Sequence, residues 1–122
     1  MNLARQGAVH MTGAFLAMGG WAVFANRAHA FPEPLFAGVV QGTVSALITL
    51  SLKRIIEAVS ARLTGHVALV VPLIVAACLS FALLVTLHSL AGTPEIAATI
   101  SVPLSVSSGY AFIYSLALWR SR

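Results

Sequence analysis

Residues 37–49, with the sequence AGVVQGTVSALIT, decide the fold of this chain. Written as a helix, this stretch places small residues along one row and polar residues along the neighbouring row. The small row consists of Gly38, Gly42 and Ala46, and the polar row consists of Gln41, Ser45 and Thr49. Small residues let a second helix approach closely, and polar residues then supply hydrogen bonds across the contact. This combination is typical of helix packing inside a membrane, so we expect the small row to be a packing face.

The composition of the whole chain also indicates a membrane protein. Of its 122 residues, 59% are hydrophobic and 8% are charged, whereas soluble domains carry about 25% charged residues. The mean hydropathy is +0.95. Because about 20 helical residues cross the hydrocarbon core, each uncharged window of the chain is long enough for one span. These windows are residues 6–26, 34–52, 63–94 and 96–119.

We therefore predict an all-α, polytopic membrane protein, built as a bundle of four transmembrane helices in two helical hairpins. The expected helices cover residues 7–27, 33–63, 67–90 and 96–119. The second is expected to extend into the cytoplasm from Lys53, where Glu57 is placed to pair with Lys53 at helical spacing. Since the loops are short, residues 1–122 are expected to form a single transmembrane domain, with no room for a catalytic domain and no enzymatic activity.

The first thirty residues allow a second interpretation. A basic start, an apolar core and the sequence Ala28-His29-Ala30 together match a secretory signal peptide with a small-x-small cleavage site. Because the apolar run is long enough to span the hydrocarbon, we interpret it as a retained first helix. Small residues on one side of this helix are expected to form a packing face. They are Gly13, Ala17 and Gly20.

The distribution of Lys and Arg predicts the orientation of the bundle. With four spans, six of the seven basic residues fall on one side of the membrane, and only Arg27 falls on the other. Lys and Arg concentrate in cytoplasmic loops, so we expect both termini in the cytoplasm and a multi-pass location in the cell inner (plasma) membrane. The basic residues adjoin apolar spans and are not interleaved with exposed aromatic residues. The net charge of +4 therefore does not indicate nucleic acid as a partner.

Polar residues inside the predicted spans form the first candidate site. Estimated depths place Gln41 and Ser45 at a height similar to that of residues 105–110. A groove at this height could bind a substrate or a lipid head group. Its candidate lining residues are Gln41, Ser45, Thr49, Ser105, Ser108 and Tyr110. The alternative, which we favour, is that these side chains only make hydrogen bonds between helices, worth about 0.6 kcal/mol each.

The predicted outer turns form the second candidate site. Candidate substrate-binding or lipid-binding residues there are Arg27, His29 and His88, with Asn26, Glu33, Thr93 and Glu95 nearby. His and Glu are metal-ligating types, but their spacing matches no zinc pattern. We therefore expect no metal site and no cofactor. An ion pair of Arg27 with Glu33 or Glu95 is the simpler interpretation.

The predicted spans contain no Asp, Glu, Lys or Arg within their uncharged windows. Ionisable residues inside a membrane usually mark proton or ion pathways, so this absence argues against a proton-coupled exporter. We expect a small integral membrane protein for transport or lipid handling, acting as an oligomer because four short helices enclose little space. The alternative is a non-catalytic subunit or interaction module of a larger membrane complex. The expected partners are membrane lipids, and either further copies of this chain or another membrane protein.

Overall fold

The computed structural model describes residues 2–122 and consists of four helices. They are α1 (Leu3–Ala25), α2 (Glu33–Ser60), α3 (Val67–Ala91) and α4 (Ile96–Arg120). This described part of the chain contains no strand, and each helix includes a segment long and apolar enough to cross a membrane. The predicted all-α, four-helix architecture is therefore confirmed. Met1, which the predicted domain also includes, lies outside the described residues.

The ends of α1 and α2 differ from the expected boundaries. α1 begins at Leu3 because Asn2 caps it, with the Asn2 Oδ1 accepting the backbone N–H of Arg5 at 2.8 Å. A side-chain cap of this kind satisfies a backbone donor that the first helical turn leaves free. α2 ends at Ser60, earlier than expected, and residues 61–63 continue as a turn held by backbone hydrogen bonds.

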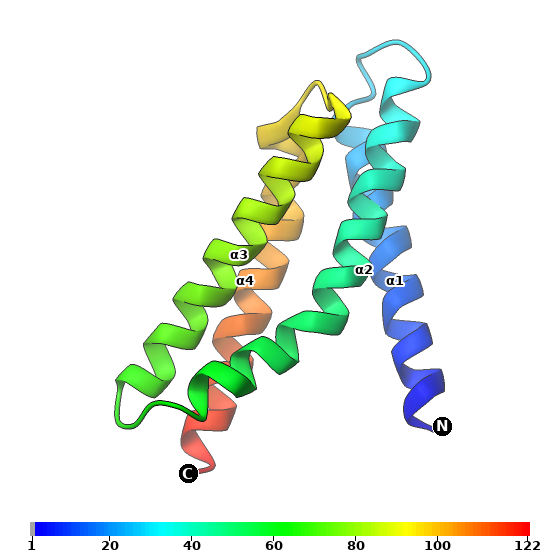
Figure 1. Cartoon of the computed structure of the whole chain (residues 1–122). Coiled ribbons are helices and arrows are strands. Elements are labelled where there is room, and N and C mark those ends of the chain that lie inside the picture. The colour runs from blue at the N-terminus through cyan, green and yellow to red at the C-terminus, as the bar shows by residue number, and fades with distance from the viewer. Residues whose placement is uncertain (1) are drawn as a thin grey trace.

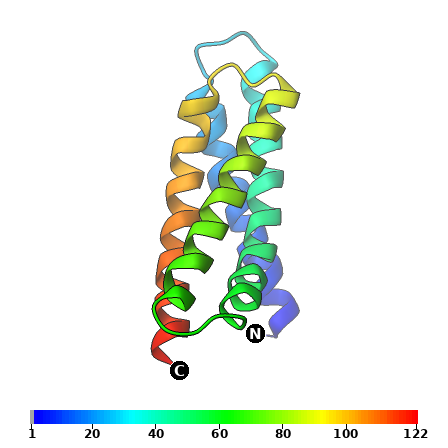
Figure 2. The same ribbon diagram turned by 60° about the vertical axis from the view of Figure 1, so that its left-hand side comes forward.

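Figures 1 and 2 show the four helices side by side, with both termini at one end of the bundle. We call this the terminal end, which also carries the α2–α3 connection, residues 61–66. The opposite end carries the connections 26–32 and 92–95 and is called the two-loop end. The chain is therefore organised as two hairpins, α1–α2 and α3–α4, that run in parallel.

Glycines hold α1 against α2. A Cβ atom built on Gly19 would lie 2.8 Å from the carbonyl oxygen of Gly38, and one built on Gly38 would lie 3.1 Å from that of Gly19. The two backbones therefore touch at this point. The ring of Phe15 covers Gly42, where an added Cβ would lie 2.9 Å from the ring. Ala46 continues the row and is partly buried.

α2 joins the two hairpins because it contacts each of the other three helices. Figure 1 shows its first part beside α1 and its last turns swinging away toward α3 and the end of α4. Thr43 and Thr49 each donate their hydroxyl to the carbonyl four residues earlier, at 2.8 Å. Such back-bonding bends helices. The bend lets Leu52 and Ile56 pack in an apolar cluster with α3 and α4.

Candidate functional site

A buried hydrogen-bond network links α2 to α3 toward the two-loop end. Gln41 and His88 are both fully buried. The Nε2 of His88 lies 2.7 Å from the Oε1 of Gln41, and its Nδ1 lies 2.6 Å from the hydroxyl of Thr93. Gln41 donates from Nε2 to the hydroxyl of Ser45 at 2.8 Å. Since an amide oxygen only accepts, a neutral His88 donates from Nε2 to Gln41, and its Nδ1 accepts the proton of Thr93.

A second group of hydrogen bonds ties α1 to α4 at the same end. Asn26, the residue that follows α1, donates to the hydroxyl of Thr99 at 2.7 Å. Its Oδ1 accepts the backbone N–H of Glu95 at 3.0 Å, and Thr99 donates to the carbonyl of Glu95 at 2.5 Å. Asn26 and Thr99 are both fully buried. The side-chain amide of Asn26 therefore links the end of α1 to the start of α4.

These two groups leave little polar surface for a ligand. In the part of the chain that the structure describes, Ser115 Oγ is the one fully enclosed side-chain polar atom without a hydrogen-bond partner. Every buried amide and imidazole toward the two-loop end instead bonds to another protein group. Buried polar groups that satisfy one another rigidify a core and hold its elements in one arrangement.

The structure does not bring the predicted midplane residues together. Gln41 and Ser45 face the interior, whereas Ser105 and Tyr110 lie on the exposed side of α4 and Ser108 is partly buried. Ser105 donates its hydroxyl to a carbonyl of its own helix at 2.7 Å. Tyr110 stacks on the ring of Tyr114, one helical turn later, with 5.7 Å between the ring centroids. Thr49 likewise bonds to its own helix.

At the surface of the two-loop end, His29 takes the role that the sequence suggested for Arg27. The Nε2 of His29 lies 3.0 Å from Glu95 Oε1, and its Nδ1 lies 3.9 Å from Glu33 Oε2. Arg27 instead folds back over Phe24, donating to its carbonyl at 2.9 Å with the guanidinium 3.8 Å from the ring centre. The expected ion pair of Arg27 is therefore wrong, because the adjacent aromatic ring and carbonyl hold this side chain.

No metal centre is assembled by these side chains. Among residues 2–122, no three His, Cys, Asp or Glu side chains are grouped to hold a metal ion. His88 lies in the buried network with Gln41, whereas His29 is partly exposed. The residues predicted for the outer-turn site are therefore divided between a surface contact made by His29 and a buried contact made by His88.

At the terminal end, Arg122 ties the C-terminus to the α2–α3 connection. Its Nη2 donates to the carbonyl and the hydroxyl of Ser60 at 2.5 and 2.6 Å, and its Nη1 donates to the carbonyl of Leu63 at 2.8 Å. The Ser60 hydroxyl in turn donates to the carbonyl of Ala68 at 3.4 Å. That carbonyl lacks its helical partner because Pro72 has no N–H. Ser60 supplies the missing donor, a pairing that sequence analysis did not anticipate.

Glu57 links α2 to α4 near the terminal end. Tyr114 donates its hydroxyl to Glu57 Oε1, and the Nζ of Lys53 lies 3.8 Å from the same oxygen. The predicted pairing of Lys53 with Glu57 is confirmed, whereas the tyrosine partner was missed. The side chain of Glu57 is less than half exposed, and its direction is set by α4.

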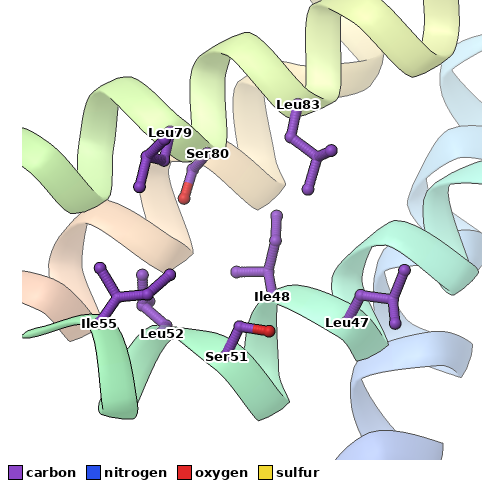
Figure 3. Close-up of a pocket in the computed structure, with 8 residues that line it drawn as sticks. All are labelled: Leu47, Ile48, Ser51, Leu52, Ile55, Leu79, Ser80 and Leu83. Atoms are coloured by element: carbon purple, nitrogen blue, oxygen red, sulfur yellow. The ribbon is translucent and has the colours of Figure 1, made fainter.

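An apolar groove opens between α2 and α3 (Figure 3). Figure 3 shows Leu79, Ser80 and Leu83 projecting from α3 toward the lining residues of α2. Six of the eight lining residues are aliphatic, so the groove suits an apolar guest. The complete lining is Leu47, Ile48, Ser51, Leu52, Ile55, Leu79, Ser80 and Leu83. Leu47 and Leu79 are each 50% exposed, so the groove opens at the surface of the bundle.

No protein family, curated protein or solved structure matches this chain. Toward the two-loop end, the buried polar side chains form hydrogen bonds with one another. An apolar groove opens at the side of the bundle between α2 and α3.

Proposed function

We propose that this protein is a multi-pass membrane protein with both termini in the cytoplasm. Four helices with the length and hydropathy of membrane spans support insertion. Six of the seven Lys and Arg residues belong to the termini or to the second half of α2 and its connection to α3. Because cytoplasmic segments collect Lys and Arg, this distribution supports a cytoplasmic terminal end, and we propose the cell inner (plasma) membrane as the location.

Within that membrane, we propose lipid handling as the function, and the groove between α2 and α3 carries this proposal. The groove opens at the side of the bundle, where hydrocarbon would surround it, and Ser51 and Ser80 supply its only hydroxyl groups. A polar solute needs polar partners, but Gln41, His88 and Asn26 already bond within the protein. A lining of six aliphatic side chains and two hydroxyl groups, with no charged or amide group, favours an acyl chain over a polar substrate.

A non-catalytic subunit of a larger membrane complex is the second candidate, and the outer face of α1 supports it. A Cβ atom added to Gly13 or Gly20 would meet no atom within 4 Å, and Ala17 between them is exposed. Such a row of small residues lets another helix approach closely. Copies of this chain, or a different membrane protein, are the partners that this face would accept.

Extraction of the protein from its native membrane into polymer-bounded nanodiscs separates the two candidates. Lipid handling predicts that mass spectrometry finds one lipid class enriched over the surrounding membrane, at a constant ratio to the protein. The subunit function predicts a second protein at a constant ratio, with lipids in the proportions of the bulk membrane. That second outcome would reject lipid handling as the function.

A further inference from the structure

We propose that the α2–α3 groove holds one acyl chain of an anionic phospholipid whose phosphate lies against Arg54 and Arg62. This inference rests on the lipid-handling proposal, and it adds the class of lipid and the position of the head group.

The lining residues of α2 follow one face of the helix toward the terminal end. Leu47, Ser51 and Ile55 recur at a spacing of four, and continuation of the same face by helical periodicity leads to Arg62 in the turn that follows the helix. Arg54 lies on the adjacent row, three residues beyond Ser51. Both arginines are exposed. The groove therefore leads to two guanidinium groups.

These two arginines retain donors for a ligand, whereas Lys53 and Arg122 at the same end are engaged. Lys53 pairs with Glu57, and Arg122 binds the α2–α3 connection. Within residues 2–122, Arg54 makes no hydrogen bond or ion pair, and Arg62 uses Nη1 alone, on a carbonyl of its own helix at 2.6 Å. Guanidinium groups bind phosphate oxygens with paired N–H donors.

The charge balance near the groove favours an anionic lipid over a zwitterionic one. Glu57 is the only side-chain carboxylate between the middle of α2 and α3, and Tyr114 and Lys53 already hold it. A zwitterionic head group would bring its own cation close to Arg54 and Arg62, whereas the anionic phosphatidylglycerol head group carries no cation. Anionic lipids are also concentrated in the cytoplasmic leaflet, which the terminal end faces in the proposed orientation.

The dimensions match one leaflet. At 1.5 Å per residue, the groove residues of α2, Leu47 to Ile55, extend over about 12 Å of the helix, which fits within the roughly 15 Å of hydrocarbon that one leaflet contributes. The flexible stem of Arg54 can carry its charge from the edge of the hydrocarbon to the head groups. A tail in the groove and a phosphate beside the arginines therefore belong to the same lipid.

The rim of the groove argues against a second helix as its occupant. Closely packed membrane helices meet through small residues, but Leu47, Leu79 and Leu83 form the exposed rim here. The small residues that would admit another helix lie on the outer face of α1. A flexible acyl chain fits between leucine side chains without that requirement.

The first experiment measures the lipid class with the full chain in nanodiscs of phosphatidylcholine with a minor share of phosphatidylglycerol. Native mass spectrometry after release should show one phosphatidylglycerol retained in preference to phosphatidylcholine. Arg54→Gln should lower the retained phosphatidylglycerol about five-fold, the effect of one cation near a membrane surface. Arg120→Gln is the matched control, since it removes the same charge from α4, which lines no part of the groove, and it should change retention little.

The second experiment fills the groove. Ser51→Phe places a ring among the lining leucines and should displace the bound lipid, whereas Thr43→Phe places the same ring on exposed surface of α2 outside the groove and should not. Melting curves of each variant report whether the fold is kept. If Ser51→Phe does not fold, Leu83→Phe at the rim of the groove takes its place in the same comparison.

The outcomes separate this inference from the function on which it rests. Equal effects of Arg54→Gln and Arg120→Gln, or no preference for phosphatidylglycerol, overturn the anionic site, while lipid handling stands if groove filling still displaces a lipid. If wild-type protein retains no lipid, or groove filling leaves retention unchanged, both proposals fail. A dimer mass that disappears with Ser51→Phe would show that a second copy occupies the groove, and it would also overturn the inference.

Discussion

His88 on α3 lies with its Nε2 2.7 Å from the Oε1 of Gln41 on α2, and both side chains are fully buried. This hydrogen bond joins the two hairpins through their interior. The other ring nitrogen of His88 bonds to Thr93 in the connection to α4. One imidazole therefore positions α2, α3 and the start of α4 relative to one another.

Gln41→Leu should reduce stability without a separate effect on function. Leucine has similar bulk, but it leaves a buried His88 donor without an acceptor, which costs about 1 to 3 kcal/mol. The measurement is the melting temperature in detergent beside a complementation assay of the deletion strain. Thr43→Val is the control, because that exposed hydroxyl bonds only to its own helix. Full stability of Gln41→Leu with loss of complementation would instead indicate a binding role for the amide.

Two adjacent glycines of α1 should respond in opposite ways to the same change. Gly19→Ala brings a methyl group into the carbonyl of Gly38 and should destabilise the fold by about 1 to 3 kcal/mol. Gly20→Ala meets open space and should stabilise the helix by up to about 1 kcal/mol. Denaturation of both variants as monomers in detergent tests this difference. Similar stabilities would show that α1 and α2 do not touch at Gly19.

Ser60 and Pro72 should be energetically coupled. Ser60→Ala removes the donor to the Ala68 carbonyl and should cost about 1 kcal/mol. In a Pro72→Ala background the cost should shrink, because alanine restores the N–H that a helix supplies to that carbonyl. A double-mutant cycle measures this coupling, for which values of about 0.5 to 1.5 kcal/mol are expected. Pro103→Ala on α4 is the control background, and equal costs in the two backgrounds would contradict the pairing.

The orientation can be tested with single cysteines in a Cys78→Ala background. Cysteines at Gln6 and Ser121 should react only with reagents that reach the cytoplasm, and one at Pro94 should react with impermeant reagents added outside. The reason is the six-to-one distribution of Lys and Arg. Labelling of the Pro94 position from the cytoplasmic side alone would reverse the proposed topology. Labelling of one position from both sides would indicate a mixed orientation.

The sequence by itself determined the features that depend on local geometry and hydrophobic length. Uncharged windows separated by charges and turn residues predicted four helices, and the structure has four. The pairing of Lys53 with Glu57 could be predicted because a spacing of four places two side chains on one helical face. Gly38 and Gly42 could be recognised as small residues on one row for the same reason.

Only the tertiary structure decided which residues meet across helices. Gly19 and Gly20 are equally small, but successive residues point about 100° apart around a helix, so the rotation of α1 selects Gly19 as the partner of Gly38. In the same way, the register of α2 against α3 places Gln41 beside His88, 47 residues away, and leaves Ser105 on an outer face. The rotation and register of each helix follow from all its contacts together, which no local pattern of residues contains.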